Sequence, residues 1–496
     1  MKSFKKKMLL AFLIAMTANT SYSGGAKKNS KDDNELIILG TYQKLENTFT
    51  KNDIKKHSNN IDPLNPIKPD DTGGDTPGPT PNPNPTPNPT PEPLVPKVDV
   101  VKESGTVVAR KFFYGENLTH NVSGDITSND GEALWMIDKN TVVVNDKTVE
   151  SNYTAANVNF DQQSVHVDDY ARFINNGTIG GINATGVYLN DHSSFENTAS
   201  GIISNASDFG VRALNNSSAV NDGHIQNAGD YGMAAFSGSS IENGVSGVIE
   251  NTGSIGMVTE DNGSSVINRG TIKNGGIYGI WISQATGENY GIIQNNTAYG
   301  IVVHDNGRAD NYGFVQNNGN FGMSAQLGAI IVNQVGGTIQ NTGNFGMNVI
   351  GTETVLTTGI NNGLIANTGE QGMSSTGVNG SIVNNGTIKN LSKIGMQVSA
   401  GATALNTGTI ENVGVRGMFA ETGASAINEG IIKNTAGSGM RAAEGGYAEN
   451  KENGLIANNS STGIYVTGLG SLGVNRGTIA NNGIYGMWIE KESVGK

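Results

Sequence analysis

The 496-residue sequence contains no cysteine and, after Pro96, no proline. The absence of cysteine excludes a disulfide framework, a zinc–thiolate site and a lipid anchor on an N-terminal cysteine. Aromatic residues make up only 6% of the chain, which argues against a conventional dense core. The formal net charge is −12, and residues 72–496 alone carry 20 Lys/Arg against 36 Asp/Glu, a net charge of −16. This acidity excludes a strongly basic nucleic-acid binder, so we expect no nucleic-acid partner.

Residues 1–23 have the pattern of a secretory signal peptide. Met1–Lys7 is basic, Met8–Met16 is an uninterrupted apolar run, and small, mostly polar residues follow up to Ser23. The apolar run is too short to span a bilayer, and no other segment approaches the roughly 18 apolar residues that a span requires. We therefore expect cleavage near Ser23 and export of the mature chain through the inner membrane.

Three segments of different composition follow the signal peptide. For the polar residues 24–62, which include one amphipathic stretch, we expect either a partly disordered leader with a transient helix or a short oligomerising or chaperone-binding helix. Residues 63–96 contain every proline of the chain and predict a polyproline II linker. Residues 97–170 alternate apolar and polar side chains without a clear repeat and predict a β-rich cap.

Residues 171–496 repeat one unit fourteen times, at a spacing of 21–26 residues. Each unit has an aliphatic anchor, a glycine two residues before it and a second glycine seven residues after it. An asparagine follows the anchor by two residues in thirteen units, and another precedes it by four residues in ten units or by six residues in the other four, which indicates a two-residue insertion. The anchors are Ile179, Ile203, Ile225, Ile249, Ile272, Ile293, Val315, Ile339, Ile365, Ile388, Ile410, Ile432, Ile456 and Ile479.

This period predicts three short strands and three turns per unit, stacked as an all-β parallel β-helix. Helical repeats need longer periods, and leucine-rich repeats need a leucine signature that is absent. We expect about fourteen coils at about 4.8 Å each, a rod of roughly 65 Å. The anchor and the Met, Ile or Val after the second glycine are expected to face the core, with glycine and asparagine in sharp turns or stacked along the rod.

The repeat units resemble the passenger domain of the autotransporter family. The signal peptide, the spacer and units such as Asn384–Asn390 (Asn-Asn-Gly-Thr-Ile-Lys-Asn), followed by Ile394–Met396, carry the resemblance. It implies a right-handed β-helix, secreted or displayed at the Gram-negative cell surface, that acts as an adhesin or interaction scaffold toward a host-cell, matrix or glycan ligand. Family members are exported through a C-terminal outer-membrane barrel. Because no strands of about ten alternating residues occur up to Lys496, we expect that translocator outside this chain, through a split or truncated gene, or else another export route.

The sequence offers only weak signals for chemistry, and we expect no catalytic, cofactor or metal site. Two loose groups of ionisable residues occur: Asp191 and His192 with Asp208 and Arg212, and His304 and Asp305 with Arg308 and Asp310. Both are interpreted as solvated loop charges. They keep open an alternative function, a carbohydrate-active β-helix enzyme of the polysaccharide lyase or hydrolase class. A purely structural stalk is a third hypothesis.

Aromatic residues at the outward position between two core residues form the candidate recognition surface. Rings on a strand face suit a sugar or protein ligand, although they also serve simply to cover the strand. The candidates are Tyr188, Trp281, Phe419, Tyr465 and Trp488.

The predicted faces can be tested on two neighbouring residues. Ile272→Asp is expected to bury an unpaired carboxylate and to lower the free energy of unfolding by several kcal/mol. Lys273→Asp, on the outward side, is expected to be nearly neutral. Equal losses in denaturant melts of the two variants would contradict the assigned faces.

Overall fold

The computed structural model describes residues 101–103, 111–129, 132–152, 163–181, 185–204, 206–480, 482–490 and 492–496, which all fall within one compact unit. The predicted signal peptide, leader and proline-rich linker lie outside these residues. The described ranges contain strands and turns, and none of their segments is a helix able to cross a membrane.

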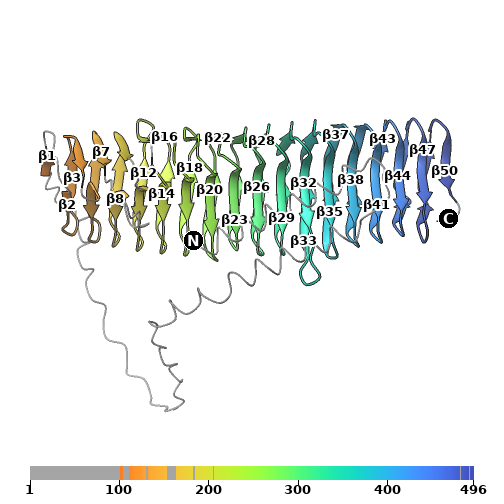
Figure 1. Cartoon of the computed structure of the whole chain (residues 1–496), viewed down its shortest axis with the longest axis horizontal. Coiled ribbons are helices and arrows are strands. Elements are labelled where there is room, and N and C mark those ends of the chain that lie inside the picture. The colour runs from red at the N-terminus through yellow and green to blue at the C-terminus, as the bar shows by residue number, and fades with distance from the viewer. Residues whose placement is uncertain are drawn as a thin grey trace, which may run out of the picture. The chain divides into compact units, whose positions relative to one another are not determined.

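The strands form three sheets, A, B and C (Figure 1).

Sheet A contains β1 (Val101–Glu103), β3 (Thr119–Val122), β6 (Val142–Asn145), β9 (Arg172–Asn175), β12 (Ser194–Asn197), β15 (Ser218–Asn221), β18 (Ser240–Asn243), β21 (Ser265–Asn268), β24 (Thr286–Asn289), β27 (Arg308–Asn311), β30 (Ile330–Asn333), β33 (Thr357–Asn361), β36 (Gly380–Asn384), β39 (Thr403–Asn406), β42 (Ser425–Asn428), β45 (Tyr447–Asn450), β48 (Leu472–Asn475) and β51 (Val494–Gly495).

Sheet B contains β4 (Ile126–Ser128), β7 (Thr148–Ser151), β10 (Thr178–Gly181), β13 (Ile202–Ser204), β16 (His224–Gln226), β19 (Val248–Glu250), β22 (Thr271–Lys273), β25 (Ile292–Gln294), β28 (Phe314–Gln316), β31 (Thr338–Gln340), β34 (Leu364–Ala366), β37 (Thr387–Leu391), β40 (Thr409–Val413), β43 (Ile431–Lys433), β46 (Leu455–Ala457) and β49 (Thr478–Ala480).

Sheet C contains β2 (Lys111–Phe113), β5 (Leu134–Met136), β8 (Gln163–Val167), β11 (Thr185–Leu189), β14 (Phe209–Ala213), β17 (Tyr231–Ala235), β20 (Ile255–Glu260), β23 (Tyr278–Ser283), β26 (Tyr299–His304), β29 (Phe321–Gln326), β32 (Phe345–Ile350), β35 (Gln371–Thr376), β38 (Ile394–Ser399), β41 (Arg416–Glu421), β44 (Ser438–Ala443), β47 (Thr462–Thr467) and β50 (Tyr485–Ile489).

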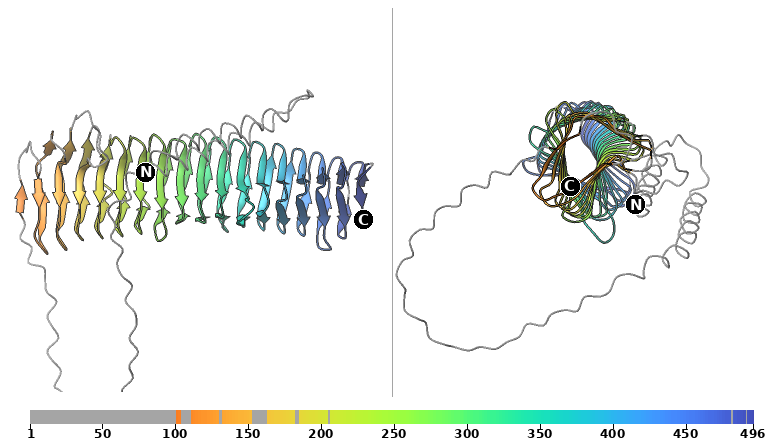
Figure 2. Two further views of the ribbon diagram at one scale, coloured as in Figure 1. Left: turned by 60° about the horizontal axis from the view of Figure 1, so that its bottom comes forward. Right: turned by 90° about the vertical axis from the view of Figure 1, so that its left-hand side faces the viewer.

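From β3 onward each turn of the chain adds one strand to each sheet, and each strand pairs in parallel with the strand three places later. For example, β22 pairs with β25 through Ile272 and Ile293. Equivalent strands therefore lie side by side along the solenoid, and the coils superpose when it is viewed from its end (Figure 2). The predicted all-β parallel solenoid is confirmed.

The solenoid extends further toward the N-terminus than the repeat count indicates. Sheet B has 16 strands, two more than the fourteen repeat units. The added strands come from residues 97–170, where the sequence predicts a β-rich cap, and they continue the same three sheets. Val149 pairs with the anchor Ile179, but Lys147 stands where the repeat has its first glycine. The repeat pattern ends here because its glycines are replaced, although the coil geometry persists.

The core consists of stacked columns of aliphatic side chains. Every anchor from Ile179 to Ile456 is fully buried, as are eight of the nine repeat methionines, while Ile479 and Met487 in the last coil are partly buried. The outward residue Lys273 is half-buried and pairs with Glu250 at 2.6 Å. The predicted inward columns are therefore confirmed.

Close approach of neighbouring coils explains the two glycine columns. A Cβ on Gly186 would lie 2.4 Å from the Gly210 carbonyl oxygen, and one on Gly201 would lie 2.4 Å from the Asn175 carbonyl oxygen, each in an adjacent coil. Such distances exclude any larger side chain.

The asparagine two residues after the anchor has a different role, because it adopts the left-handed backbone conformation at a turn. Eleven of these residues are described with φ between 51° and 58°, a range that asparagine tolerates better than most residues. They are Asn227, Asn251, Asn274, Asn295, Asn317, Asn341, Asn367, Asn390, Asn412, Asn434 and Asn458.

The second asparagine of each unit belongs to a buried amide ladder inside sheet A. Each Nδ2 donates to the Oδ1 of the equivalent residue in the next coil at 2.7–2.9 Å, and most also donate to a glycine carbonyl of their own coil. Asn197, six residues before its anchor, pairs with Asn221, four before its own, which confirms the two-residue insertion. The ladder is formed by Asn145, Asn175, Asn197, Asn221, Asn243, Asn268, Asn289, Asn311, Asn333, Asn361, Asn384, Asn406, Asn428, Asn450 and Asn475.

Asn384 and Asn385 provide a matched test of this ladder. Asn384 is fully buried, donates to Asn406 and accepts from Asn361, whereas Asn385 is exposed. Asn384→Leu removes one hydrogen-bond partner from each of two buried amides, those of Asn361 and Asn406, and is expected to lower the free energy of unfolding by roughly 2–3 kcal/mol. Asn385→Leu is expected to cost under about 1 kcal/mol. Similar losses for both in denaturant unfolding would show that the ladder does not stabilise the fold.

Candidate functional site

The five predicted recognition residues lie in one register column on the outer side of sheet C. Each occupies the strand position that pairs with the same position in the next coil, and we call this series the outer column. Its members are Phe112, Trp135, His166, Tyr188, Arg212, Ala234, Val258, Trp281, Val302, Ser324, Asn348, Ser374, Gln397, Phe419, Arg441, Tyr465 and Trp488.

The N-terminal part of the outer column is a continuous series of rings in contact. The ring centroids of Trp135 and His166 lie 4.8 Å apart and the rings are nearly parallel, while Phe112 and Tyr188 contact the two ends of this pair. The Arg212 guanidinium then lies 5.6 Å from the Tyr188 ring centroid. Tyr188 is thus one member of a larger cluster that the outward pattern predicted only in part.

The C-terminal part of the outer column alternates rings and guanidinium. Arg441 lies between Phe419 and Tyr465, at 5.4 Å and 5.0 Å from their ring centroids, and Trp488 contacts Tyr465 at 5.2 Å. Each such cation–π contact contributes about 0.5–1 kcal/mol at a solvent-exposed site. Three of the five predicted residues are therefore brought together in neighbouring coils.

A carboxylate fixes the polar edge of this C-terminal group. Glu490 accepts hydrogen bonds from the hydroxyls of Thr467 and Tyr465, both at 2.5 Å. These bonds lower the pKa of Glu490, with Thr467 the largest cause, and the bond to Glu490 raises the pKa of the Tyr465 phenol. At neutral pH the group therefore presents a charged carboxylate and a protonated phenol, held in fixed positions.

Exposure corrects the expectation for two of the five rings. Trp281 is fully buried, with its ring stacked on His304 at 4.6 Å and edge-on to Tyr278. Phe419 is only 6% exposed because guanidinium groups, including Arg416 at 4.6 Å, cover its ring. Trp488 is 43% exposed, and Tyr188 and Tyr465 are half-buried. Outward position alone does not predict exposure, because neighbouring side chains pack over the rings of Trp281 and Phe419.

An exposed aromatic pair that the sequence analysis did not single out lies between sheets A and B. Tyr290 and Tyr312 stack at 4.8 Å with 4° between their planes, and both are about 40% exposed. The Arg269 guanidinium lies 4.7 Å from the Tyr290 centroid. Their signal was present in the sequence, because each tyrosine directly follows a ladder asparagine and precedes a glycine in consecutive units.

The structure separates the second loose group of ionisable residues. Arg308 and Asp310 form a two-point pair at 2.6 Å and 2.7 Å on sheet A. His304 lies at the end of a sheet C strand against Trp281, and Asp305 accepts a hydrogen bond from Ser283. This second group is therefore divided between two faces of the solenoid.

In the first loose group, His192 and Arg212 contact different residues. His192 pairs with Asp191 at 2.9 Å and stacks on Tyr170. The Arg212 guanidinium lies over aromatic rings of the outer column instead. Among the described residues, no three His, Asp or Glu side chains converge as a metal site would require.

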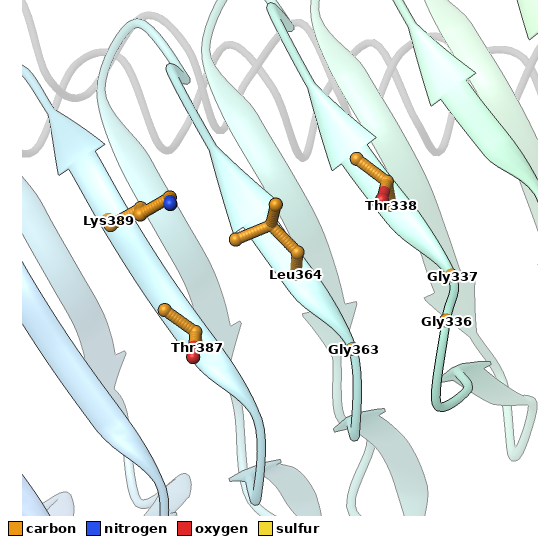
Figure 3. Close-up of a pocket in the computed structure, with 7 residues that line it drawn as sticks. All are labelled: Gly336, Gly337, Thr338, Gly363, Leu364, Thr387 and Lys389. Carbon is orange, nitrogen blue, oxygen red and sulfur yellow. The ribbon is translucent and has the colours of Figure 1, made fainter.

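A shallow depression lies on the outer side of sheet B. Glycine backbone forms part of its lining, and Lys389 is the single ionisable residue among those that line it (Figure 3). Most glycoside hydrolases act through a pair of carboxyl groups, and this lining contains none. The lining residues are Gly336, Gly337, Thr338, Gly363, Leu364, Thr387 and Lys389.

No protein-family model matches the chain, and no curated protein matches its sequence.

Tryptophan fluorescence tests the exposure of the outer column. The chain has three tryptophans, of which Trp281 is fully buried and Trp488 is 43% exposed. Trp488→Phe is expected to remove a component that acrylamide quenches readily, whereas Trp281→Phe is expected to remove a poorly quenched one. The opposite order in Stern–Volmer plots of the two variants would contradict the described faces.

Proposed function

We propose that this chain is a non-enzymatic β-solenoid, secreted or displayed at the cell surface, that acts as an adhesin or interaction scaffold similar to an autotransporter passenger. The outer column of sheet C is the observation that carries the proposal. It sets rings and guanidinium groups along one line at the spacing of the coils, about 4.8 Å, with the Glu490 carboxylate beside the C-terminal end of that line. A long ligand can contact several such groups at once, because each coil adds contact area without changing the fold.

The exposed groups of the column favour a glycan as the ligand. Arg441 lies over the Phe419 and Tyr465 rings and Trp488 is tilted against Tyr465, so a ligand meets the accessible parts of Tyr465 and Trp488 and polar groups such as Arg441 and Glu490. A glycan offers both C–H surface and hydroxyl groups to such a mixture. The glycan is one of a broader set of ligands, which also includes matrix proteins and other host-cell molecules.

Export and display rest on the signal-peptide pattern and on the resemblance to autotransporter passengers. In this proposal an outer-membrane translocator barrel is the partner that places the solenoid outside a Gram-negative cell. Sequencing the DNA downstream of codon 496 tests this partner. A barrel-encoding reading frame there would support display by the same locus, and its absence would favour a separate export route.

Binding is tested with the full chain on glycan arrays and on cultured cells. The double variant Tyr465→Ala/Trp488→Ala is expected to reduce binding at least tenfold, since it removes two contacting rings of about 1–2 kcal/mol each. Tyr290→Ala/Tyr312→Ala is the matched control, because it removes two stacked, partly exposed rings from a different face.

Two results would contradict the proposal. One is binding lost in the control and retained in the outer-column variant. The other is release of oligosaccharides from acidic polysaccharides by the wild-type chain but not by Asp208→Asn or Asp305→Asn. The second result would establish the enzymatic alternative.

A further inference from the structure

The chain contains eleven Asn–Gly dipeptides, and all of them lie within the described residues. In this dipeptide the glycine nitrogen can attack the asparagine side chain with little hindrance, because glycine has no side chain to shield it. The attack releases the side-chain amide and changes the protein without an enzyme. The eleven asparagines are Asn176, Asn243, Asn262, Asn274, Asn306, Asn318, Asn362, Asn379, Asn385, Asn453 and Asn482.

In nine of the eleven dipeptides the glycine N–H is held in a hydrogen bond. It donates to a backbone carbonyl oxygen or, in one case, to an asparagine side-chain oxygen, at 2.8–3.1 Å. A nitrogen held in this way cannot turn toward the preceding side chain until the bond breaks, so the solenoid protects these sites. The nine donors are Gly177, Gly244, Gly275, Gly307, Gly319, Gly380, Gly386, Gly454 and Gly483.

Asn262–Gly263 is the dipeptide in which neither reacting group is held. The N–H groups of Gly263 and Gly363 have no hydrogen-bond acceptor among the described residues. The side chain of Asn362 is nevertheless fixed, because its Nδ2 donates to Gln334 and its Oδ1 accepts from an amide of the next coil. The Asn262 amide makes no hydrogen bond within the described ranges. Asn262 therefore combines an unbonded side chain with an unbonded nitrogen.

The turn at residues 261–264 is fixed at its ends and open at its centre. The Ser264 N–H donates to the Asp261 carbonyl oxygen at 3.2 Å, and the Asp261 carboxylate accepts from a backbone N–H of the preceding coil. Asn262 and Gly263, between these two residues, are exposed. Gly263 has a φ of 87°, and a Cβ built on it would meet a single neighbouring atom, at 3.6 Å. The two groups that must meet therefore have room to do so.

We propose that Asn262 is a non-enzymatic modification site, at which water replaces the side-chain amide by deamidation. The Gly263 nitrogen attacks Cγ of Asn262, the N–Cγ bond forms and the Cγ–Nδ2 bond breaks. The proton of the attacking nitrogen passes through solvent to the leaving group, which departs as ammonia, and a succinimide ring remains. Water then opens the ring. Cleavage of the bond to Cγ gives aspartate, and cleavage of the bond to the main-chain carbonyl carbon gives isoaspartate.

Deamidation at this position changes the surface and leaves the coils paired. Asn262 lies in the turn between β20 and β21, so the extra main-chain carbon of isoaspartate falls outside both strands. The new carboxylate is next in sequence to the exposed Asp261 and makes this corner of an acidic chain more negative. Because the ammonia is lost to solvent, the modified fraction rises with the age of the molecule. This inference does not depend on the ligand of the outer column.

Peptide mapping of the full folded chain by mass spectrometry tests the proposal. During incubation at mildly alkaline pH, aspartate and isoaspartate are expected to accumulate at Asn262 at least about tenfold faster than at any other Asn–Gly site. Asn453 is the matched internal control. It is also exposed and its side chain has no hydrogen-bond partner among the described residues, but the Gly454 N–H donates to the Lys451 carbonyl oxygen at 2.8 Å.

Unfolding separates the effect of the fold from that of the dipeptide. In denaturant the hydrogen bond of Gly454 is lost, so Asn262 and Asn453 are expected to react at similar rates. Equal rates at the two sites in the folded chain would overturn the proposal, and so would an Asn262 that stays about tenfold faster in denaturant.

Two variants give an independent measurement by isoelectric focusing. Aged wild-type chain is expected to gain an acidic species, because each deamidation adds one carboxylate. Asn262→Gln is expected to remove most of this species, since glutamine has to close a larger ring, whereas Asn453→Gln is expected to retain it. Far-UV circular dichroism verifies that both variants fold. An acidic species that is undiminished in Asn262→Gln would contradict the assignment.

Discussion

The hydrogen bond between stacked asparagine amides fixes the register on which the rest of the structure depends. The ladder amides from Asn145 to Asn450 are buried, so their Nδ2 and Oδ1 atoms need partners that water does not supply. The equivalent amide in the next coil supplies them at 2.7–2.9 Å, as between Asn289 and Asn311. If a coil were displaced by one residue, these groups would be unpaired. Residues with a Cβ would also stand at the positions where only glycine fits against the neighbouring coil. The buried asparagine ladder therefore sets the register of the coils, and the anchor residues align in the same register.

Because register is fixed, equivalent strand residues of successive coils form columns. Rings stack on rings, as in the largely buried run from Tyr278 through Tyr299 and Phe321 to Phe345, and surface charges pair between adjacent coils, as Arg269 does with Glu242. Such surface ion pairs contribute little to stability, about 0–1 kcal/mol each. Their effect is on the polarity of the surface. An outward column that contains acids is polar, and one that lacks them is apolar, as in the sheet A column of Val332, Ile360, Val383, Leu405 and Ile427.

Variation in unit length leaves this register intact because it is confined to the turns. Asn197 and Asn221 stand at different distances from their anchors yet bond to each other, since the extra residues bulge outward between the ladder and the anchor strand. The turn at residues 351–356 accommodates a longer insertion between sheets C and A in the same manner. Turns can therefore differ from coil to coil and carry side chains such as Leu356 that the strands do not.

The sequence by itself determined the solenoid, its inward columns and the turn asparagines. Stacking requires a similar residue at the same position of every coil, so the structure appears in the sequence as a repeat. It also identified the outward position shared by Tyr188, Trp281, Phe419, Tyr465 and Trp488. Only the tertiary structure decided which rings are exposed, that Tyr290 and Tyr312 stack, that residues of the predicted cap continue the coil, and that five aliphatic residues line up on sheet A. These properties depend on side chains from different coils and columns meeting in space, which a single repeat unit does not encode.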